Sequence, residues 1–569
     1  MASGHAKRWA VGAGVLLLVG LAAGTWWLLR PGPPTVETLK ESVELAATGG
    51  DRVLREPMRP LTPGPRVLLF ALDGVGASEF RQAVREHASG SIHALLGPER
   101  GEHLYEHGFA VPGALSILPS TTVAAWASVY TGQPPARTGV PGNEWFARDE
   151  VRFYAPAPVS VHAKEDVLHT LTDGLVGKAL KVPTLFELAD VRAFVSLAHV
   201  YRGADLFTTP EPSAAADLLV DFARGLVGHP DVERETYAEL DQESVAHVVE
   251  TLGQHGIPRL QVVYFPGVDL YTHVASEPLE QQRRYVREVL DPLVGRVLDA
   301  YAQAGVLDDT HVLFVSDHGH TPVLGDDRHA LSAQGEDEPT TVLEHAGFRL
   351  RPLTLEVEPQ ARDYQAVVAY QGAMAYVYLA DRSTCPKPGQ RCDWSRPPRW
   401  EEDVLPVVRA FHRASQTGEG AADMKGALDL IFARVGRHVS EDAPPFQVFD
   451  GERLVPPREY LSAHPRPDLL NLAERMEGLG AGPVGHLAGD VLLLTRTGLE
   501  RPLSERYYFA NHYSSWHGSP SAQDSLVTFV VARPGEAGAQ VRARVEPLVG
   551  PQPSLLHVTP LVRELLGTH

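Results

Sequence analysis

The chain has 569 residues, of which 44% are hydrophobic and 21% are charged, as is ordinary for a globular protein. Its formal net charge of -20 argues against a basic groove for nucleic acid, so we expect no binding to a nucleic-acid duplex. An anionic substrate would therefore need a local positive centre, which a bound metal would supply.

The N-terminus predicts a membrane anchor. Lys7 and Arg8 precede an apolar run of 21 residues, Trp9–Leu29, which as a helix would span roughly the hydrocarbon thickness of a bilayer. Because the positive flank comes first, we expect the catalytic part on the periplasmic or extracellular side. A cleaved signal peptide is the competing interpretation, but the bulky Trp26–Leu29 lies where a small-residue cleavage site would be.

The stretch Leu118–Trp145, LPSTTVAAWASVYTGQPPARTGVPGNEW, offers a hydroxyl at the start of a segment with helical spacing. Thr122 follows Thr121 there, and Asn143 comes 21 positions later. A threonine hydroxyl is a nucleophile only if its surroundings lower its pKa. Taken alone, this segment favours a simple helix cap for Thr122.

Polar residues follow two continuous apolar runs that read as buried strands of a parallel sheet. Asp73 ends the first run, Arg66–Leu72, and Asp269 and His273 follow the second, Leu260–Phe265. The carboxyl ends of strands are where open α/β sheets build their sites.

The same pattern returns twice further along the chain. His311–Val315 reads as a strand that leads into Asp317 and His318, and His517 precedes a fourth expected strand, Ser525–Val531. Asp and neutral His are suitable zinc ligands, and two ions roughly 4 Å apart form a clamp for displacement at phosphorus. Each fragment is weak alone, but together with Thr122 they indicate a two-metal phosphoesterase.

This ordered set resembles the alkaline phosphatase superfamily, and within it the type I phosphodiesterase/nucleotide pyrophosphatase branch. The motifs that carry the resemblance are LFALDG, LPSTTVAAWASVYTGQPPARTGVPGNEWF, PTLFELA, YFPGVDLYTHVAS, FVSDHGH, WHGSP and HVTPLVRELLG. The resemblance implies an α/β fold with an alkaline-phosphatase-like core, a mostly parallel sheet flanked by helices. It implies Thr122 as nucleophile and Asn143 as an oxygen-binding donor. It also implies two zinc ions, one held by Asp269, His273 and His517 and one held by Asp73, Thr122, Asp317 and His318.

The departures from the branch concern substrate preference rather than metal binding. Thr121 stands where the branch often has Lys, Ala124 and Ala125 replace a Pro-Asn pair, and Trp126 stands where His is frequent. The resemblance makes cleavage of phosphodiester or pyrophosphate bonds in small, nucleotide-type substrates the leading expectation. A phosphomonoesterase and a phospho-headgroup transferase are the alternatives, and a non-catalytic surface binding protein is the rival from another class.

Arg202 is a candidate substrate-binding residue. It follows an expected strand, Ala193–Leu197, in the sequence Tyr-Arg-Gly-Ala. In threonine-nucleophile monoesterases of the superfamily an Arg before Gly-Ala grips the additional phosphate charge, and a guanidinium suits that task. The companion Lys of those enzymes is absent, with Val200 at the nearest position, and a surface Arg in a loop is the equally weighted alternative.

The segment 348–467 interrupts the core and is expected to form an inserted subdomain near the rim of the site. It holds Cys385 and Cys392, for which a disulfide is the expected state outside the cytoplasm and a metal site the rival. Three further histidines near the motifs are expected to be structural or to support the ligands: His320, His329 and His512. The expected layout is a cytoplasmic tip at 1–8, an anchor at 9–29, a linker at 30–64, the core at 65–347 and 468–569, and the insertion at 348–467.

Overall fold

The computed structural model describes residues 51–161, 165–210, 234–332, 338–435 and 442–568. The expected anchor at 9–29 and the first part of the linker lie outside these ranges. Within the described residues, no helix combines the length and the apolar character needed to cross a membrane.

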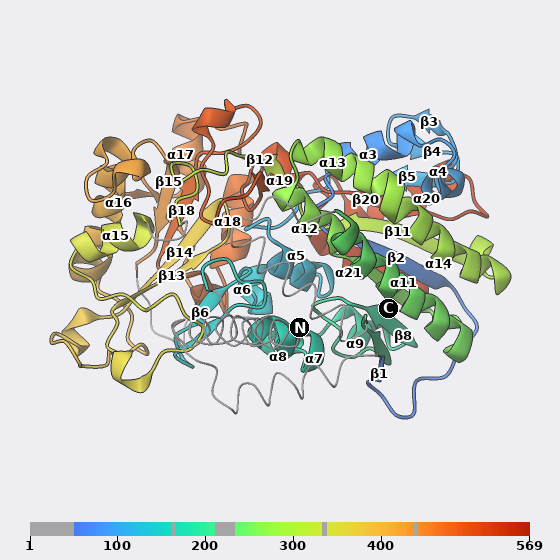
Figure 1. Cartoon of the computed structure of the whole chain (residues 1–569), viewed down its shortest axis with the longest axis horizontal. Coiled ribbons are helices and arrows are strands. Elements are labelled where there is room, and N and C mark those ends of the chain that lie inside the picture. Colours follow the sequence, from blue (N-terminus) through green and yellow to red (C-terminus); the bar gives the residue numbers. More distant parts are fainter. Residues whose placement is uncertain (1–50, 162–164, 211–233, 333–337, 436–441, 569) are drawn as a thin grey trace, which may run out of the picture. The chain divides into compact units, whose positions relative to one another are not determined.

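A ten-stranded sheet forms the centre of the chain (Figure 1). Five neighbouring strands, from β9 to β11 in the spatial order, run parallel to one another, and the strands on either side of them pair antiparallel. In spatial order the strands are β1 (Arg52–Val53), β9 (Leu206–Thr208), β8 (Ala193–Ser196), β10 (Leu260–Phe265), β2 (Arg66–Leu72), β11 (Thr310–Ser316), β20 (Phe529–Ala532), β5 (Gly108–Ala110), β4 (Leu104–Tyr105) and β3 (Glu99–Gly101).

Helices cover both faces of this sheet, which explains why its strands are apolar without alternation. Val67, Leu69 and Ala71 of β2 belong to one hydrophobic core, and Leu68 and Phe70 belong to another on the opposite face. The first core includes α5 (Thr122–Val129), α9 (Leu185–Ala189), α20 (Gly538–Val549) and α21 (Val558–Leu566). The second includes α3 (Ala77–Glu86), α4 (Ser91–Leu96), α11 (Arg234–His255), α13 (Pro278–Tyr285) and α14 (Asp291–Gln303).

The structure confirms the expected mixed α/β class and four of the expected strands. Of these, β11 is one residue longer at each end than the sequence indicated, and β8 ends one residue earlier. The strand expected at Ser525–Val531 was wrong at its start, because β20 begins at Phe529. Ala522–Ser525 is instead a short helix, α19, whose turn is fixed by the Asp524 carboxylate accepting from the Ser519 amide at 3.0 Å.

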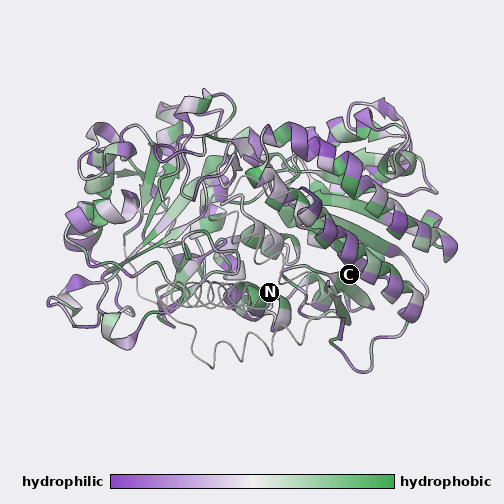
Figure 2. Cartoon of the chain, viewed as in Figure 1, coloured by the Kyte–Doolittle hydropathy of each residue, from purple (hydrophilic) through white to green (hydrophobic). Residues whose placement is uncertain are grey.

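A second sheet of six antiparallel strands lies in the C-terminal half of the chain. In spatial order its strands are β13 (Ala366–Tyr370), β14 (Met374–Leu379), β18 (Val491–Thr495), β15 (Leu428–Ala433), β16 (Gln447–Phe449) and β17 (Leu454–Val455). The helices around it are α15 (Glu338–His345), α16 (Leu405–Thr417), α17 (Pro457–Ala463) and α18 (Leu472–Gly480). Figure 2 shows that the strands of both sheets are largely hydrophobic, whereas the helices carry mixed faces. Cys385 and Cys392 form the expected disulfide.

Candidate active site

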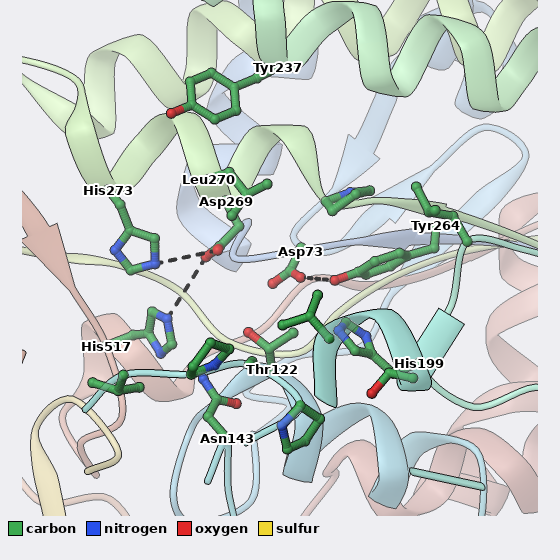
Figure 3. A pocket seen from close by; sticks show the side chains of 18 of the residues that line it. Asp73, Thr122, Asn143, His199, Tyr237, Tyr264, Asp269, Leu270, His273 and His517 are labelled. Carbon is green, nitrogen blue, oxygen red and sulfur yellow. Dashed lines mark hydrogen bonds and ion pairs between the residues drawn. The ribbon is translucent and has the colours of Figure 1, made fainter. Parts of the chain in front are cut away.

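Three neighbouring parallel strands bring three carboxylates to one edge of the large sheet. Asp73 directly follows β2, Asp317 directly follows β11, and Asp269 lies in the first turn of α12 (Gly267–Val274), which follows β10. Because β10, β2 and β11 are adjacent in the sheet, their carboxyl ends meet. The structure brings these residues together, since His318 Nε2 lies within 4.0 Å of a carboxylate oxygen of each. Figure 3 shows Asp73 and Asp269 pointing into the same cavity.

Asp73, Asp317 and His318 form one cluster that could hold a metal ion. His318 Nε2 lies 3.4 Å from Asp73 Oδ1 and 3.3 Å from Asp317 Oδ2. The other ring nitrogen, Nδ1, faces the Gly319 carbonyl at 3.1 Å and must donate to it. In the neutral ring Nε2 therefore carries a lone pair, directed at two carboxylate oxygens.

Asp269, His273 and His517 form a second cluster with the same character. Nε2 of His273 lies 3.4 Å from Asp269 Oδ2, and Nε2 of His517 lies 3.9 Å from Asp269 Oδ1. Each ring turns its Nδ1 to a carbonyl, His273 to Ser515 at 2.9 Å and His517 to Ser120 at 3.0 Å. Both Nε2 lone pairs are thereby aimed at the carboxylate.

The two clusters fit divalent cations, because acceptors face acceptors with no donor between them. Among the described residues, Asp73 Oδ1 and Asp317 Oδ2 are buried without a hydrogen-bond partner. Burial, together with the nearby Asp317 and Asp269, holds the pKa of Asp73 well above its usual range, and burial raises the pKa of Asp317 to about 8. Burial lowers the pKa of His318 to about 3, so the ring is neutral and ready to ligate.

Glycine at position 74 lets β2 end this close to the clusters. Gly74 has a φ of 69°, in the left-handed region, and a Cβ there would lie only 2.7 Å from Asp269 Oδ1. Its amide donates to Asp317 Oδ1 at 3.0 Å. Glycine after Asp73 is thus required by both conformation and space.

Thr122 is the first residue of α5, and its hydroxyl oxygen lies 3.2 Å from His318 Nε2. The N-cap position belongs to Thr121, so the interpretation of Thr122 as a cap was wrong. The N-terminus of a helix favours negative charge, which suits an oxygen that must approach the alkoxide state. The hydroxyl therefore lies beside the first cluster, at the positive end of the helix.

Asn143 lies beside Thr122 with its amide fixed in one orientation (Figure 3). Its side-chain oxygen accepts from the Val123 amide at 3.0 Å, and its own backbone amide donates to Gln371 Oε1 at 2.7 Å. Because the oxygen is engaged by an N–H group, the Nδ2 donor is the part of the side chain left to face the cavity that Asn143 lines.

His320, expected to be structural or to support the ligands, reaches the second cluster. Its Nε2 lies 2.7 Å from Asp269 Oδ1, and Asp269, His318 and His320 make a third group with metal-binding spacing. His329 contacts Asp326 and His512 contacts Asp327, and neither belongs to a cluster found in the described residues.

Arg202 is not brought to the other candidates. Its guanidinium donates to both oxygens of Glu187 and to the carbonyls of Gly177, Leu180 and Val182 at 2.6–3.1 Å. It is also not among the described residues that line the cavity. The contacts are those of a residue that fixes the chain between α8 (Leu175–Ala179) and α9.

Two residues of the site were missed by sequence reasoning. The Tyr264 hydroxyl donates to Asp73 Oδ2, but a tyrosine inside the apolar run of β10 looks like any core residue. His199 lines the cavity three positions after the end of β8, with its ring 5.4 Å from that of Tyr264. The rule that polar residues after strands build sites would have found His199.

The comparison with known families agrees with this geometry. The model of the type I phosphodiesterase / nucleotide pyrophosphatase family matches residues 67–397, more than half of the chain. The chain belongs to this family. The family lies within the alkaline phosphatase superfamily and comprises metal-dependent hydrolases that act on phosphoester bonds of small substrates. All the clustered residues except His517 fall in the matched range. No curated protein matches the chain.

Proposed function

We propose that this member of the type I phosphodiesterase / nucleotide pyrophosphatase family cleaves phosphodiester or pyrophosphate bonds with Thr122 as nucleophile and two zinc ions. The observation that carries the proposal is the convergence of two clusters in which carboxylate oxygens face His Nε2 atoms, with the Thr122 hydroxyl beside the first of them. Asp73, Asp317, His318 and Thr122 would hold one ion, and Asp269, His273 and His517 the other.

Bound divalent ions would supply the positive charge that favours the ionised hydroxyl and offsets charge developing at the phosphoryl group. Thr122 Oγ1 releases its proton to solvent and forms a bond to phosphorus, while the bond from phosphorus to the leaving oxygen breaks and that oxygen departs with the electron pair. Water then cleaves the bond between phosphorus and Oγ1: its oxygen stays on phosphorus and a proton returns to Oγ1, which restores the hydroxyl.

Asn143 would bind a phosphoryl oxygen during both steps. Its oxygen is engaged by the Val123 amide at 3.0 Å, so its Nδ2 group is available as a fixed donor. A donor held in place before the reaction stabilises developing charge without reorganisation.

A diester is favoured over a monoester because of charge. A monoester carries nearly two negative charges near neutral pH, whereas a diester carries one. Among the described residues that line the cavity there is no Lys or Arg, and Arg202 is engaged elsewhere. The monoesterase alternative therefore lacks its cationic group in the described part of the site.

We also propose that the catalytic part lies outside the cytoplasm, held by an anchor at 9–29. The support is the basic flank and length of that run and the disulfide between Cys385 and Cys392, since disulfides persist mainly in oxidising compartments.

Metal content of two ligand variants tests the proposed centre. Asp317→Asn and Asp269→Asn should each lose one ion per chain by mass spectrometry of the metals. Each should also lose more activity on bis-p-nitrophenyl phosphate than the roughly 10–100-fold typical of a supporting residue. Asp308→Asn is the matched control, because Asp308 is exposed and precedes β11, whereas Asp317 follows it. Full zinc content and turnover in both ligand variants would refute the assignment.

A further inference from the structure

The cavity that holds Thr122 extends beyond the clusters into a space with apolar walls, of about 150 Å³ in all (Figure 3). These walls would contact the substituents of the phosphoryl group, whereas the clusters would bind the phosphoryl group itself. A substrate preference set by these walls rests on the proposed function.

A single helix, α12, makes both the metal-binding edge and one apolar wall. Asp269 and His273 are four residues apart and share one face, and Leu270 and Val274, each one position later, share the adjacent face. Leu270 and Val274 are only half-buried, because they border the cavity. An apolar surface therefore begins directly beside the second cluster.

Helix α7 contributes a second apolar wall, again through residues spaced by one helical turn. Val167 and Leu171 are four residues apart on α7 (Glu165–Thr172) and both line the cavity. The segment Pro156–Val159 continues this wall. Near the second cluster, the rings of Tyr513 and Trp516 stack with centroids 5.0 Å apart and add an aromatic surface.

The polar groups in these walls are mostly engaged within the protein. Thr170 Oγ1 donates to the Asp166 carbonyl at 2.7 Å, and the Tyr264 hydroxyl donates to Asp73. His199 is the polar side chain on the far side of Tyr264, and burial lowers its pKa to about 4, so it is neutral. Beyond the clusters the described lining offers no cation, and its buried nitrogen atoms without a hydrogen-bond partner are His199 Nδ1 and Trp516 Nε1. Two isolated nitrogen atoms give a charged or sugar-like group few partners.

We propose that the substrate is a phosphodiester with one negative charge whose second substituent is uncharged and apolar, an alkyl or aryl alcohol that fills the space between α7 and α12. Nucleotide-type substituents, with additional phosphates or a hydroxylated sugar, fit these walls less well.

A series of p-nitrophenyl diesters with a constant leaving group tests the proposal. The second substituent is varied among ethyl, octyl, naphthyl, 2-carboxyethyl and thymidine. Each methylene that leaves water raises kcat/KM by up to about fourfold, so octyl should exceed ethyl by at least about tenfold even if only part of the chain is enclosed. The 2-carboxyethyl and thymidine esters should have a lower kcat/KM than the apolar esters. Comparison of the naphthyl with the octyl ester shows whether the site prefers an aryl or an alkyl substituent.

Val167→Lys places a cation in the wall. It should raise kcat/KM for the 2-carboxyethyl ester relative to the ethyl ester and lower kcat/KM for the octyl ester. Glu165→Lys is the matched control, since Glu165 lies exposed on the same helix and should leave the order of substrates unchanged. Calorimetric titration of the wild type with octyl(methyl)phosphinate, an anion with two P–C bonds and no ester oxygen that could leave, needs neither turnover nor a variant. It should give a more negative heat-capacity change than ethyl(methyl)phosphinate.

The outcomes separate this inference from the function on which it rests. Cleavage of every ester at the same rate, or a preference for 2-carboxyethyl or thymidine in the wild type, would overturn the apolar subsite and leave the phosphodiesterase intact. If no diester in the series were cleaved by zinc-loaded protein, the proposed function and the subsite would fall together.

Discussion

Removing the Tyr264 hydroxyl should weaken metal binding without disturbing the fold. The hydroxyl donates to Asp73 Oδ2, and the Tyr264 ring packs edge-on against Trp126 with centroids 5.6 Å apart. In Tyr264→Phe the ring contacts remain, but among the described residues Asp73 then has no side-chain donor, since its Oδ1 already has no hydrogen-bond partner. Burial and two neighbouring carboxylates already raise the pKa of Asp73, and loss of the Tyr264 bond raises it further.

The expected magnitude follows from the role of such partners. A residue that orients a metal ligand typically contributes 10–100-fold in metal affinity, or about 1.4–2.7 kcal/mol. Competition with a zinc chelator, followed by the metal-to-protein ratio, measures this loss. Tyr130→Phe is the control, because the Tyr130 hydroxyl is buried without a hydrogen-bond partner among the described residues, and its removal strands nothing. A Tyr264→Phe affinity within twofold of wild type, or an equal loss in Tyr130→Phe, would refute the reasoning.

Three further predictions concern Arg202 and Arg475, whose guanidinium groups donate hydrogen bonds within the protein, and the carboxylates of the first cluster. Arg202→Ala should lower the free energy of unfolding, measured in urea, by about 1.5–3 kcal/mol, because three carbonyls lose a charged donor. It should leave the ratio of diester to monoester turnover unchanged. A selective loss of monoester turnover would contradict this. Arg475→Met should destabilise by about 2–4 kcal/mol in the same assay, because the buried guanidinium donates to the carbonyls of Ile117 and Leu470, and a loss below about 1 kcal/mol would argue against it. The raised pKa values of Asp73 and Asp317 stabilise the metal-free protein at low pH and cease to do so as pH rises through the folded value, about 8 for Asp317. Calorimetry should therefore find that the melting temperature of the metal-free protein falls, relative to that of the zinc-loaded protein, between about pH 5 and pH 8. A difference between the two melting temperatures that does not change with pH would contradict this expectation.

The ends of the central strands could be predicted because buried parallel strands are continuous apolar runs. Such a run stops where the chain leaves the two covering layers of helices, so Asp73, Asp269 and Asp317 stand out against their neighbours. Strand adjacency then brings the residues together without further information. The start of β20 was missed because Ser525–Thr528 is locally strand-like. In the structure Ser525 ends α19, and Leu526 and Val527 form only isolated bridges with Leu115 and Gly76. The Asp524 carboxylate of α19 accepts from Ser519 and Thr321, which are contacts that the local sequence does not show.

The role of Arg202 could not be obtained from its local sequence. A guanidinium before Gly-Ala is compatible with phosphate binding, and only the folded chain shows that three carbonyls from 177–182 surround it. The role of Tyr264 could not be predicted from its local sequence either. Its hydroxyl reaches Asp73 because β10 pairs with β2 in the folded chain. The roles of both residues depend on contacts between segments that are distant in the sequence, and residue spacing along the chain does not reveal such contacts.

Identification of the covalent intermediate tests the central claim most directly. Turnover of bis-p-nitrophenyl phosphate would be quenched with acid within one catalytic cycle, and the peptides would be analysed by mass spectrometry. We expect a p-nitrophenyl phosphoryl group on the peptide that contains Thr122, placed on that residue by fragmentation and absent from Thr122→Val. An adduct on another residue, or turnover by Thr122→Val at the wild-type rate, would contradict it.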